Sequence, residues 1–261
     1  MFEFDHVSLG YPTSRNAGTK YLPIIDNLTL SLTGGEFVCV LGPSGCGKTT
    51  LLNLAAGFLT PDQGQVRFDG REINGPSPQR GVVFQDATLF PWRTVLGNVM
   101  FGLRRQGVDR HQARLQAITI LTQVGLGEHI DAWPVTLSGG MRQRAALARI
   151  LALNPKALLL DEPFSALDAN SREHLQDTLL DLWQKQPRTV LYITHSVEEA
   201  AYLADRVLIF GPAPNHLCAD LPVTLPRPRY RSSTEVQNLA RTLRQHLNQL
   251  PCCLKPSKDP S

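Results

Sequence analysis

Residues 42–49 read Gly42-Pro43-Ser44-Gly45-Cys46-Gly47-Lys48-Thr49, which matches the pattern G-x-x-x-x-G-K-[ST]. The apolar run 36–41 before this stretch predicts a buried strand, and residues 50–56 after it predict a helix. A strand, a glycine-rich loop and a helix therefore follow one another in the order that a phosphate-binding loop requires. This order makes an ordinary glycine-rich turn with a solvated lysine the weaker alternative.

The loop has residues that suit the binding of a nucleoside triphosphate. Its glycines let successive backbone N–H groups turn toward phosphate oxygens, and the helix adds positive potential at its N-terminus. Lys48 can reach the β- and γ-phosphates, and the Thr49 hydroxyl can ligate Mg²⁺. The predicted nucleotide-binding residues here are Gly42, Pro43, Ser44, Gly45, Cys46, Gly47, Lys48, Thr49 and Thr50.

Short apolar runs alternate with helical patterns along most of the chain. Five such runs predict a buried, mostly parallel α/β sheet. Three other segments alternate polar and apolar residues and predict antiparallel strands with one solvated face. The expected parallel strands are 36–41, 81–84, 157–160, 189–194 and 206–210, and the expected antiparallel strands are 2–9, 25–32 and 65–68.

Two regions are distinct from these strands. More than 70 residues of helical character separate strand 81–84 from strand 157–160, which indicates a helical insertion. After Gly211, five prolines and a helical stretch from about Thr234 to Leu250 indicate an appendage. We expect a nucleotide-binding core with the antiparallel β subdomain over 1–84 and 155–211, a helical subdomain over 85–154, and a C-terminal extension over 212–261.

Composition limits the class of protein. The 261 residues are 42% hydrophobic and 19% charged, as in a globular protein of one large or two modest domains. The apolar runs are far shorter than the roughly 20 residues that cross a bilayer. A net charge of +3 does not indicate a nucleic-acid binder. The five cysteines have neither zinc-ligand spacing nor a secretory signal before them, which predicts a reduced, cytosolic compartment.

Two acidic residues follow strand 157–160, at the carboxyl end of the strand, where α/β sheets form ligand sites. Asp161 is expected to hold Mg²⁺ through its water shell. Glu162 points in another direction and could polarise an attacking water molecule. The plainer alternative for either carboxylate is a loop cap.

A third motif begins an Ala-rich helix with the stretch Leu137-Ser138-Gly139-Gly140-Met141-Arg142-Gln143-Arg144. Ser138 is expected to cap this helix, and the two glycines expose backbone N–H groups at its positive end. Alone, the motif could be an ordinary capped helix. Together with the loop at 42–49, it predicts a second anion site that the chain's own nucleotide does not need.

These three motifs, in this order, resemble those of the ATP-binding subunits of ABC transporters, over residues 1 to about 210. The resemblance implies a P-loop NTPase (RecA-like) α/β core that hydrolyses ATP with Mg²⁺. It also implies a head-to-tail homodimer, in which Ser138, Gly139 and Gly140 of one subunit bind the γ-phosphate of ATP held by the other.

The resemblance implies roles for four further residues. Gln85 resembles the Q-loop glutamine that contacts Mg²⁺ and water, Asp168 the D-loop aspartate at the dimer seam, and His195 the switch histidine on the γ-phosphate. Tyr11 resembles the aromatic residue that stacks on adenine, although it could equally pack a turn. The implied catalytic residues are Glu162, His195, Gln85 and Lys48, and the implied metal ligands are Thr49, Gln85 and Asp161.

Partners also follow from the resemblance. It implies an integral membrane permease that docks near Gln85, and through it a solute-binding protein, with no role for nucleic acid. Phe90, Pro91 and Trp92 form an apolar cluster suited to a partner helix. The alternative is that Trp92 fills a junction between the sheet and the helical insertion. The implied place is the cytoplasmic face of the inner membrane, as a peripheral subunit.

Three shorter stretches resemble the nitrate/sulfonate/taurine importer group: Gly75-Pro76, Pro91-Trp92-Arg93 and Leu225-Pro226-Arg227-Pro228-Arg229. This likeness implies uptake of a small solute, an anion or sulfonate. Importers of thiamine-precursor pyrimidines share much of it, so they stay an alternative. The second alternative is a non-transport ABC ATPase. Chromosome-type members of that class need a long coiled coil between the phosphate loop and the third motif, and the fewer than 100 residues between Gly47 and Ser138 leave no room for it.

Overall fold

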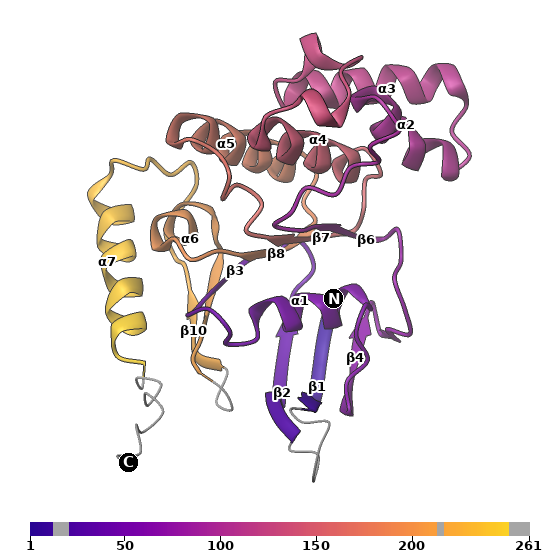
Figure 1. Cartoon of the computed structure of the whole chain (residues 1–261). Coiled ribbons are helices and arrows are strands. Elements are labelled where there is room, and N and C mark those ends of the chain that lie inside the picture. The colour runs from indigo at the N-terminus through magenta and orange to yellow at the C-terminus, as the bar shows by residue number, and fades with distance from the viewer. Residues whose placement is uncertain (13–20, 213–216, 251–261) are drawn as a thin grey trace, which may run out of the picture. The chain divides into compact units, whose positions relative to one another are not determined.

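The computed structural model describes residues 1–12, 21–212 and 217–250. These residues divide into two compact units (Figure 1). Unit 1 comprises the described residues within Met1–Thr33, Val38–Asn74 and Ile193–Ser261, and unit 2 comprises Gly34–Phe37 and Gly75–Tyr192. The three-part division expected from the sequence, 1–84 with 155–211, 85–154 and 212–261, stays a prediction.

Unit 1 contains the expected antiparallel sheet. Its strand order is β2-β1-β4-β5, with β1 at Phe2–Pro12, β2 at Tyr21–Leu32, β4 at Gln63–Phe68 and β5 at Arg71–Glu72. Phe4 on β1 lies opposite Leu30 on β2 and Val66 on β4, and all three side chains are buried. Side chains of this kind on one face of a sheet form its core, which explains the alternation in the sequence.

Unit 1 also contains the strand before the glycine-rich loop. Four of the five residues of β3 (Phe37–Leu41) belong to this unit, and β3 pairs in parallel with β9 (Arg206–Phe210). Both strands are almost entirely buried, as their apolar runs predict. The helices of this unit are α1 (Lys48–Ala56), α6 (Val197–Leu203) and α7 (Thr234–Asn248), and α7 packs on α6.

The residues after Gly211 were expected to form an extension outside the nucleotide-binding core, and their first part adds a strand that the sequence analysis did not predict. Residues Leu217–Pro222 form β10, which pairs antiparallel with β9 and extends the same sheet. An edge strand tolerates proline because one side of its backbone needs no ladder partner. The prolines of this region therefore conceal a strand.

Unit 2 contains the other parallel strands and most of the helices. Its strands follow the order β8-β7-β6, and β6 (Arg80–Val83) pairs in parallel with β7 (Ala157–Asp161). Except for its last residue, β8 (Thr189–Ile193) belongs to the same unit. The helices are α2 (Val95–Arg105), α3 (Arg110–Gln123), α4 (Gly139–Leu151) and α5 (Ala169–Lys185), with short 3-10 turns at Gly127–His129 and Pro134–Thr136.

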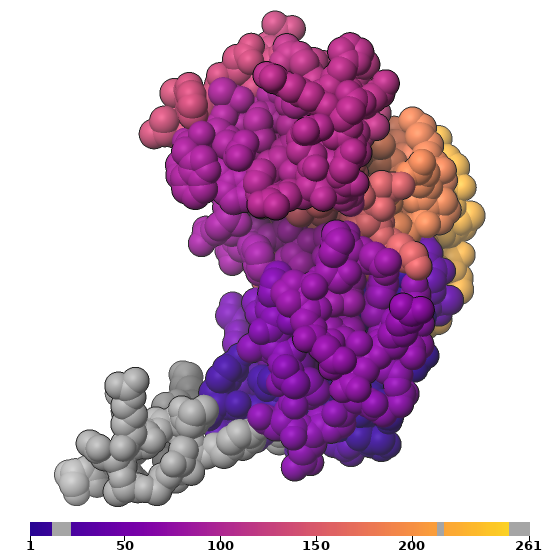
Figure 2. Space-filling model, turned by 90° about the vertical axis from the view of Figure 1, so that its right-hand side faces the viewer, coloured from indigo at the N-terminus to yellow at the C-terminus, as the bar shows by residue number. Residues whose placement is uncertain are grey.

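The helical character expected between strands 81–84 and 157–160 is confirmed. Ala113, Ala117 and Leu121 are buried on one face of α3, in agreement with their amphipathic spacing. Small residues also bring α2 close to the chain after α4, since a Cβ on Gly102 would lie 2.5 Å from a methyl group of Leu153. Figure 2 shows the outer surface of this helical segment in magenta.

Candidate functional site

The glycine-rich loop of unit 1 connects β3 to α1 and depends on two glycines. A Cβ atom on Gly42 would lie 2.4 Å from the carbonyl oxygen of Phe210, so no other residue fits there. Gly47 has a φ of 95° and forms the N-cap of α1, a conformation that glycine adopts without strain. Pro43, Ser44 and Gly45 are exposed between them. The loop therefore presents backbone groups to solvent at the positive end of a helix.

Lys48 lies inside this loop. Its side chain is only 8% exposed, and its Nζ donates hydrogen bonds to the carbonyl oxygens of Gly42 at 2.8 Å and Pro43 at 2.7 Å. Cys46 is buried beside it, with Sγ 3.8 Å from Nζ. Burial raises the pKa of the Cys46 thiol, so the thiol is neutral near pH 7. The loop thus encloses a single positive charge.

His195 lies near the same edge of unit 1 as the loop. The backbone N–H of Thr194 donates to the carbonyl oxygen of Val40 at 3.2 Å. The carboxyl end of the strand that precedes His195 is therefore next to the carboxyl end of the strand that precedes Gly42. His195 itself is exposed. Ligand sites of α/β sheets form at such carboxyl ends. The structure therefore brings His195 and the loop to one edge.

Three further predicted residues lie in unit 1. Thr49 and Thr50 lie in the first turn of α1, with Thr49 exposed and Thr50 half-buried. Tyr11 lies near the end of β1, opposite Leu22 of β2, with 45% of its surface exposed. The pairing of Tyr11 within the sheet leaves its expected contact with adenine a prediction.

Unit 2 places Asp161, Glu162 and Gln85 at the ends of neighbouring strands. Val83 pairs with Leu160, so Gln85, two residues after β6, lies near the end of β7, where Asp161 is the last residue of the strand and Glu162 follows it. Asp161 is buried, whereas Glu162 is half-buried and Gln85 is exposed. These three residues therefore lie along one edge of the sheet in unit 2, and their catalytic and metal-binding roles stay predictions.

The backbone of Glu162 is strained. Its φ is 44°, a left-handed conformation that residues with a side chain seldom adopt. Ser165 holds this conformation, because its N–H and its hydroxyl both donate to the Glu162 carbonyl oxygen, at 3.2 and 3.0 Å. Strain of about 1–3 kcal/mol per residue is typical of functional sites. The conformation of Glu162 thus favours a catalytic role over a loop cap.

The third motif forms the N-terminus of α4. Ser138 is the N-cap, with its hydroxyl oxygen accepting from the Met141 N–H at 3.2 Å. Ser138 is exposed, Gly139 is half-buried and Gly140 is buried against Leu167, where a Cβ would lie 2.4 Å from a methyl group. This close approach explains the second glycine.

Asp168 forms the N-cap of α5. Its carboxylate accepts from the Ser171 N–H at 2.9 Å, and this hydrogen bond lowers the pKa of Asp168. The capping role accounts for the geometry of Asp168, and its expected place at a dimer seam stays a prediction.

Sequence reasoning missed Gln143, which connects α4 to the segment of Gln85. Gln143 is 3% exposed, and its Nε2 donates to the backbone carbonyl of Gln85 at 3.3 Å. Its Oε1 has no hydrogen-bond partner among the described residues. Gln143 stands in the third motif, but nothing in the motif indicates that its side chain points inward.

A second missed residue is Asn98, which organises the loop 90–94. Asn98 is fully buried; its Oδ1 accepts from the Phe90 N–H at 2.7 Å, and its Nδ2 lies within 3.2 Å of the carbonyl oxygens of Phe90, Arg93 and Thr94. The loop so fixed carries Trp92, which is 69% exposed. High exposure excludes the alternative that Trp92 fills a junction.

Replacement of Asn98 by alanine should loosen this loop. The change removes the hydrogen-bond partner of the Phe90 N–H and of carbonyls at three half-buried residues, and a backbone group left unsatisfied in a buried place costs about 1–3 kcal/mol. We expect hydrogen exchange of the Phe90 N–H to rise at least tenfold and proteolysis after Arg93 to accelerate. Gln112→Ala, on the exposed face of α3, is the matched control. Unchanged exchange in Asn98→Ala would contradict the role of this amide.

Each unit carries an oxygen donor of the kind that Mg²⁺ prefers. In unit 2, Asp161 offers a carboxylate, and in unit 1, Thr49 offers an exposed hydroxyl, so the residue types are compatible with the expected magnesium ion. Mg²⁺ is commonly bound through one or two carboxylates together with substrate phosphates and water.

None of the described helices has the length and apolarity to cross a membrane.

Comparisons with known proteins agree with this geometry. Residues 25–165 match the ABC transporter family. The chain is 49% identical over 216 residues to a taurine import ATP-binding protein of Pseudomonas aeruginosa, covering 83% of this chain and 82% of that protein. It is 50% identical over 211 residues to an ABC transporter ATP-binding protein of Methanocaldococcus jannaschii, covering 81% and 79%.

Solved structures give the same result. A dimeric structure of a post-hydrolysis state of an ATP-binding cassette, bound to ADP and Pi, superposes with a TM-score of 0.76 at 28% identity. It covers 87% of this chain and 100% of that one. The dimeric structure of a bacterial ABC transporter cassette superposes with a TM-score of 0.78 over the same shares. The P-loop NTPase fold expected from the sequence is therefore confirmed.

Proposed function

The chain belongs to the family of ABC transporter ATP-binding subunits, and we propose that it energises the uptake of a small anion or sulfonate through a separate membrane permease. ATP hydrolysis coupled to transport is the activity of this family. The taurine import proteins among the relatives support a sulfonate as the transported solute. The proposed place of work is the cytoplasmic face of the inner membrane.

The position of Lys48 carries the proposal. Its ammonium group lies within the loop, where two carbonyl oxygens accept its hydrogen bonds. Phosphate oxygens of ATP would replace these carbonyls, since an ammonium donates more strongly to an anionic oxygen than to a neutral carbonyl. Residues 42–50 would then surround the triphosphate, and Tyr11 would stack on the adenine. Mg²⁺, when bound by Thr49, Asp161 and Gln85, would neutralise part of the phosphate charge.

Two copies of the chain would complete the catalytic site. We propose that Ser138, Gly139 and Gly140 of one copy bind the γ-phosphate held by the other, and that Asp168 lies at the seam. The exposed Ser138 and the positive end of α4 support this arrangement. The dimeric cassette structures support it as well.

Hydrolysis would then depend on electrostatic stabilisation. The transferred phosphoryl group spreads its charge over three oxygens, and Lys48, His195 and the glycine N–H groups of the second copy would stabilise that charge. Glu162 would accept a proton from the attacking water and orient it. ATP thus joins the two copies, and hydrolysis releases them.

The exposed loop around Trp92 supports a docking site for the permease. The Phe90 ring packs against Trp92 in a tilted arrangement and against Phe101 edge to face, with ring centroids 5.6 and 4.9 Å apart. The guanidinium of Arg149 lies 5.5 Å from the Phe90 ring. An aromatic surface with arginine nearby is typical of protein interfaces. Trp92 lies seven residues after Gln85. Movement of a permease bound at Trp92 would therefore reach the segment that carries Gln85.

Reconstitution with the permease that co-purifies with the tagged chain tests the proposal. We expect a taurine-loaded solute-binding protein to raise ATP turnover at least tenfold above the unloaded protein. Nitrate-loaded and pyrimidine-loaded binding proteins serve as the comparison. Stimulation by pyrimidine alone would contradict the sulfonate assignment, and failure of any permease to co-purify would contradict the transport function.

A further inference from the structure

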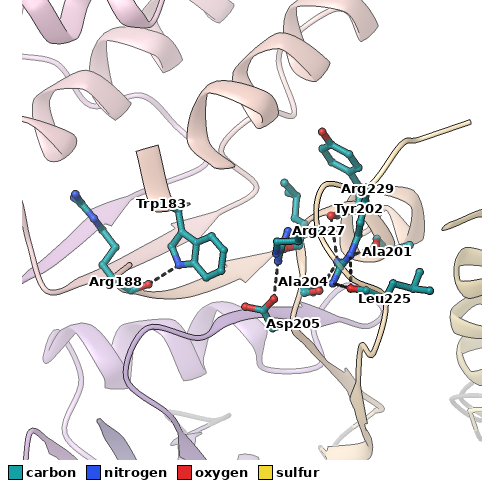
Figure 3. A network of polar contacts seen from close by, with 10 residues as sticks. Trp183, Arg188, Ala201, Tyr202, Ala204, Asp205, Leu225, Arg227 and Arg229 are labelled. Atoms are coloured by element: carbon teal, nitrogen blue, oxygen red, sulfur yellow. Dashed lines mark hydrogen bonds and ion pairs between the residues drawn. The ribbon is translucent and has the colours of Figure 1, made fainter. Parts of the chain in front are cut away.

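The segment 225–231 directs two arginines at the C-terminal end of α6 (Figure 3). Arg229 is 8% exposed, and its Nη1 donates to the carbonyl oxygens of Ala204 at 2.6 Å, Tyr202 at 3.2 Å and Ala201 at 3.3 Å. Its Nη2 donates to the carbonyl oxygen of Leu225 at 2.9 Å. One guanidinium therefore ties its own segment to three carbonyls of the helix end.

Arg227 occupies the remaining carbonyl. Its Nη2 donates to the carbonyl oxygen of Leu203 at 2.5 Å and to Asp205 Oδ1 at 2.8 Å. Every carbonyl from 201 to 204 thus accepts a hydrogen bond from Arg227 or Arg229, which we call the arginine pair. A helix leaves its last four carbonyls unpaired, and cations at this end interact favourably with its dipole. The arginine pair therefore satisfies the end of α6.

α6 needs such support because it has only seven residues. An isolated helix shorter than about 12 residues is marginal in water. Its sequence offers no basic residue in the last turn. The positive groups that the helix end requires come from a segment more than 20 residues further along the chain.

The opposite end of α6 carries the catalytic histidine of the proposed function. Ser196 is the N-cap and immediately follows His195. The Thr194 hydroxyl donates to Glu199 Oε2 at 2.6 Å, and its oxygen accepts from the Ser196 N–H at 3.0 Å. Glu199 and Ser196 belong to the first turn of the helix and its cap. These hydrogen bonds therefore tie the turn of His195 to α6, which the arginine pair holds at its far end and α7 holds along its side.

We propose that Arg229, with Arg227, is a positioning residue for His195: the arginine pair holds α6 in register, and α6 holds the histidine turn beside the phosphate loop. The inference rests on the proposed function, in which His195 contacts the γ-phosphate. It gives the motif Leu225-Pro226-Arg227-Pro228-Arg229 a physical role, and it makes the C-terminal extension part of the catalytic support.

Arginine is required for this role. Burial lowers the pKa of Arg229 to about 10, so the guanidinium is still charged at neutral pH. Its planar fork reaches four carbonyls from two nitrogens, whereas a lysine ammonium has three donors on one atom. Lysine should therefore restore the charge without restoring the set of hydrogen bonds.

Hydrogen exchange and steady-state kinetics of Arg229→Met and Arg229→Lys in the full chain test the inference. We expect amide exchange in α6 to rise at least tenfold in Arg229→Met and by a smaller factor in Arg229→Lys. The kcat for ATP should fall about tenfold, and the KM for ATP should change less than twofold because the phosphate loop is intact. Exchange in α1 should not change. Arg241→Met on α7 is the control, since the Arg241 guanidinium bonds to Asn238 within its own helix.

A double variant separates this inference from the proposed function. If Arg229 acts through His195, Arg229→Met should cause no further loss of kcat in a His195→Ala background. Additive losses would overturn the inference, and so would wild-type kcat in Arg229→Met despite rapid exchange in α6. Full activity of His195→Ala would instead overturn the role of His195 in the proposed function. If Arg229→Met does not fold, Arg227→Met, at a half-buried position, takes its place with the same expectations.

Discussion

Replacement of Glu162 by glutamine is expected to lower ATP turnover about 100-fold or more, the size of effect that a general base contributes. The amide cannot accept a proton from the attacking water. Glutamine keeps the shape of the side chain, so the strained backbone with its φ of 44° should persist. ATP binding, which depends on the loop of unit 1, should not weaken. Phosphate release and ATP titration measure the two quantities separately.

The same variant should accumulate as an ATP-bound dimer. If two copies enclose the nucleotide and only hydrolysis releases them, blocking hydrolysis leaves them joined. Light scattering with Mg-ATP should report twice the monomer mass for Glu162→Gln and monomer after ATP is removed. A monomer under both conditions would contradict the sandwich of two copies, whatever the turnover.

Glu128→Gln is the matched control for both measurements. Glu128 lies in the short 3-10 turn Gly127–His129 of the same unit and is exposed. The change in charge is identical, and we expect turnover within about twofold of wild type, since surface substitutions away from functional groups cost little. A loss as large as that of Glu162→Gln would show that charge alone, and not the position of Glu162, determines turnover.

The strands were largely predictable from the sequence because their burial leaves a direct pattern. The apolar runs at 206–210 and 157–160 correspond to β9 and β7 within one residue. Strands that are buried on both faces have continuous apolar sequences, and this signal needs no knowledge of the neighbours. The antiparallel strands show the alternation of one solvated face.

β10 was not predictable in the same way. Its residues alternate between half-buried and exposed, and no side chain of Leu217–Pro222 is fully buried. The strand exists because β9 offers it an unpaired edge, which is a property of the partner. The surrounding prolines indicate a loop, so the local sequence contradicts the local structure.

Some residues of the candidate site could likewise be predicted from the sequence, and others could not. Motif residues such as Lys48 and Asp161 were identified from their types and spacing, which the chemistry of phosphate requires. The buried roles of Asn98 and Arg229 were not, because each depends on backbone carbonyls that the fold turns toward the side chain, those of the loop 90–94 for Asn98 and those at the end of α6 for Arg229. Burial of a polar group depends on partners that only the fold brings together. No pattern within a few residues contains that information.

Replacement of Lys48 by alanine is expected to weaken ATP binding about 100-fold, since each hydrogen bond from a charged group contributes about 1.5–3 kcal/mol and Lys48 can reach two phosphates. Isothermal titration with ATP measures the loss. The fold should be retained: the carbonyls of Gly42 and Pro43 lose the ammonium, but Gly42 is only half-buried and Pro43 is exposed, so water can replace it.

Lys185→Ala separates this effect from the loss of any one positive charge. Lys185 ends α5 and is exposed, so its removal changes the net charge equally and should leave ATP affinity within about twofold. Affinity for adenosine, which has no phosphates, should be equal in wild type and Lys48→Ala if the ammonium acts on phosphate alone. Wild-type affinity for ATP in Lys48→Ala would mean that the glycine-rich loop does not hold the triphosphate, and the catalytic roles proposed for Glu162 and His195 would lose their common premise.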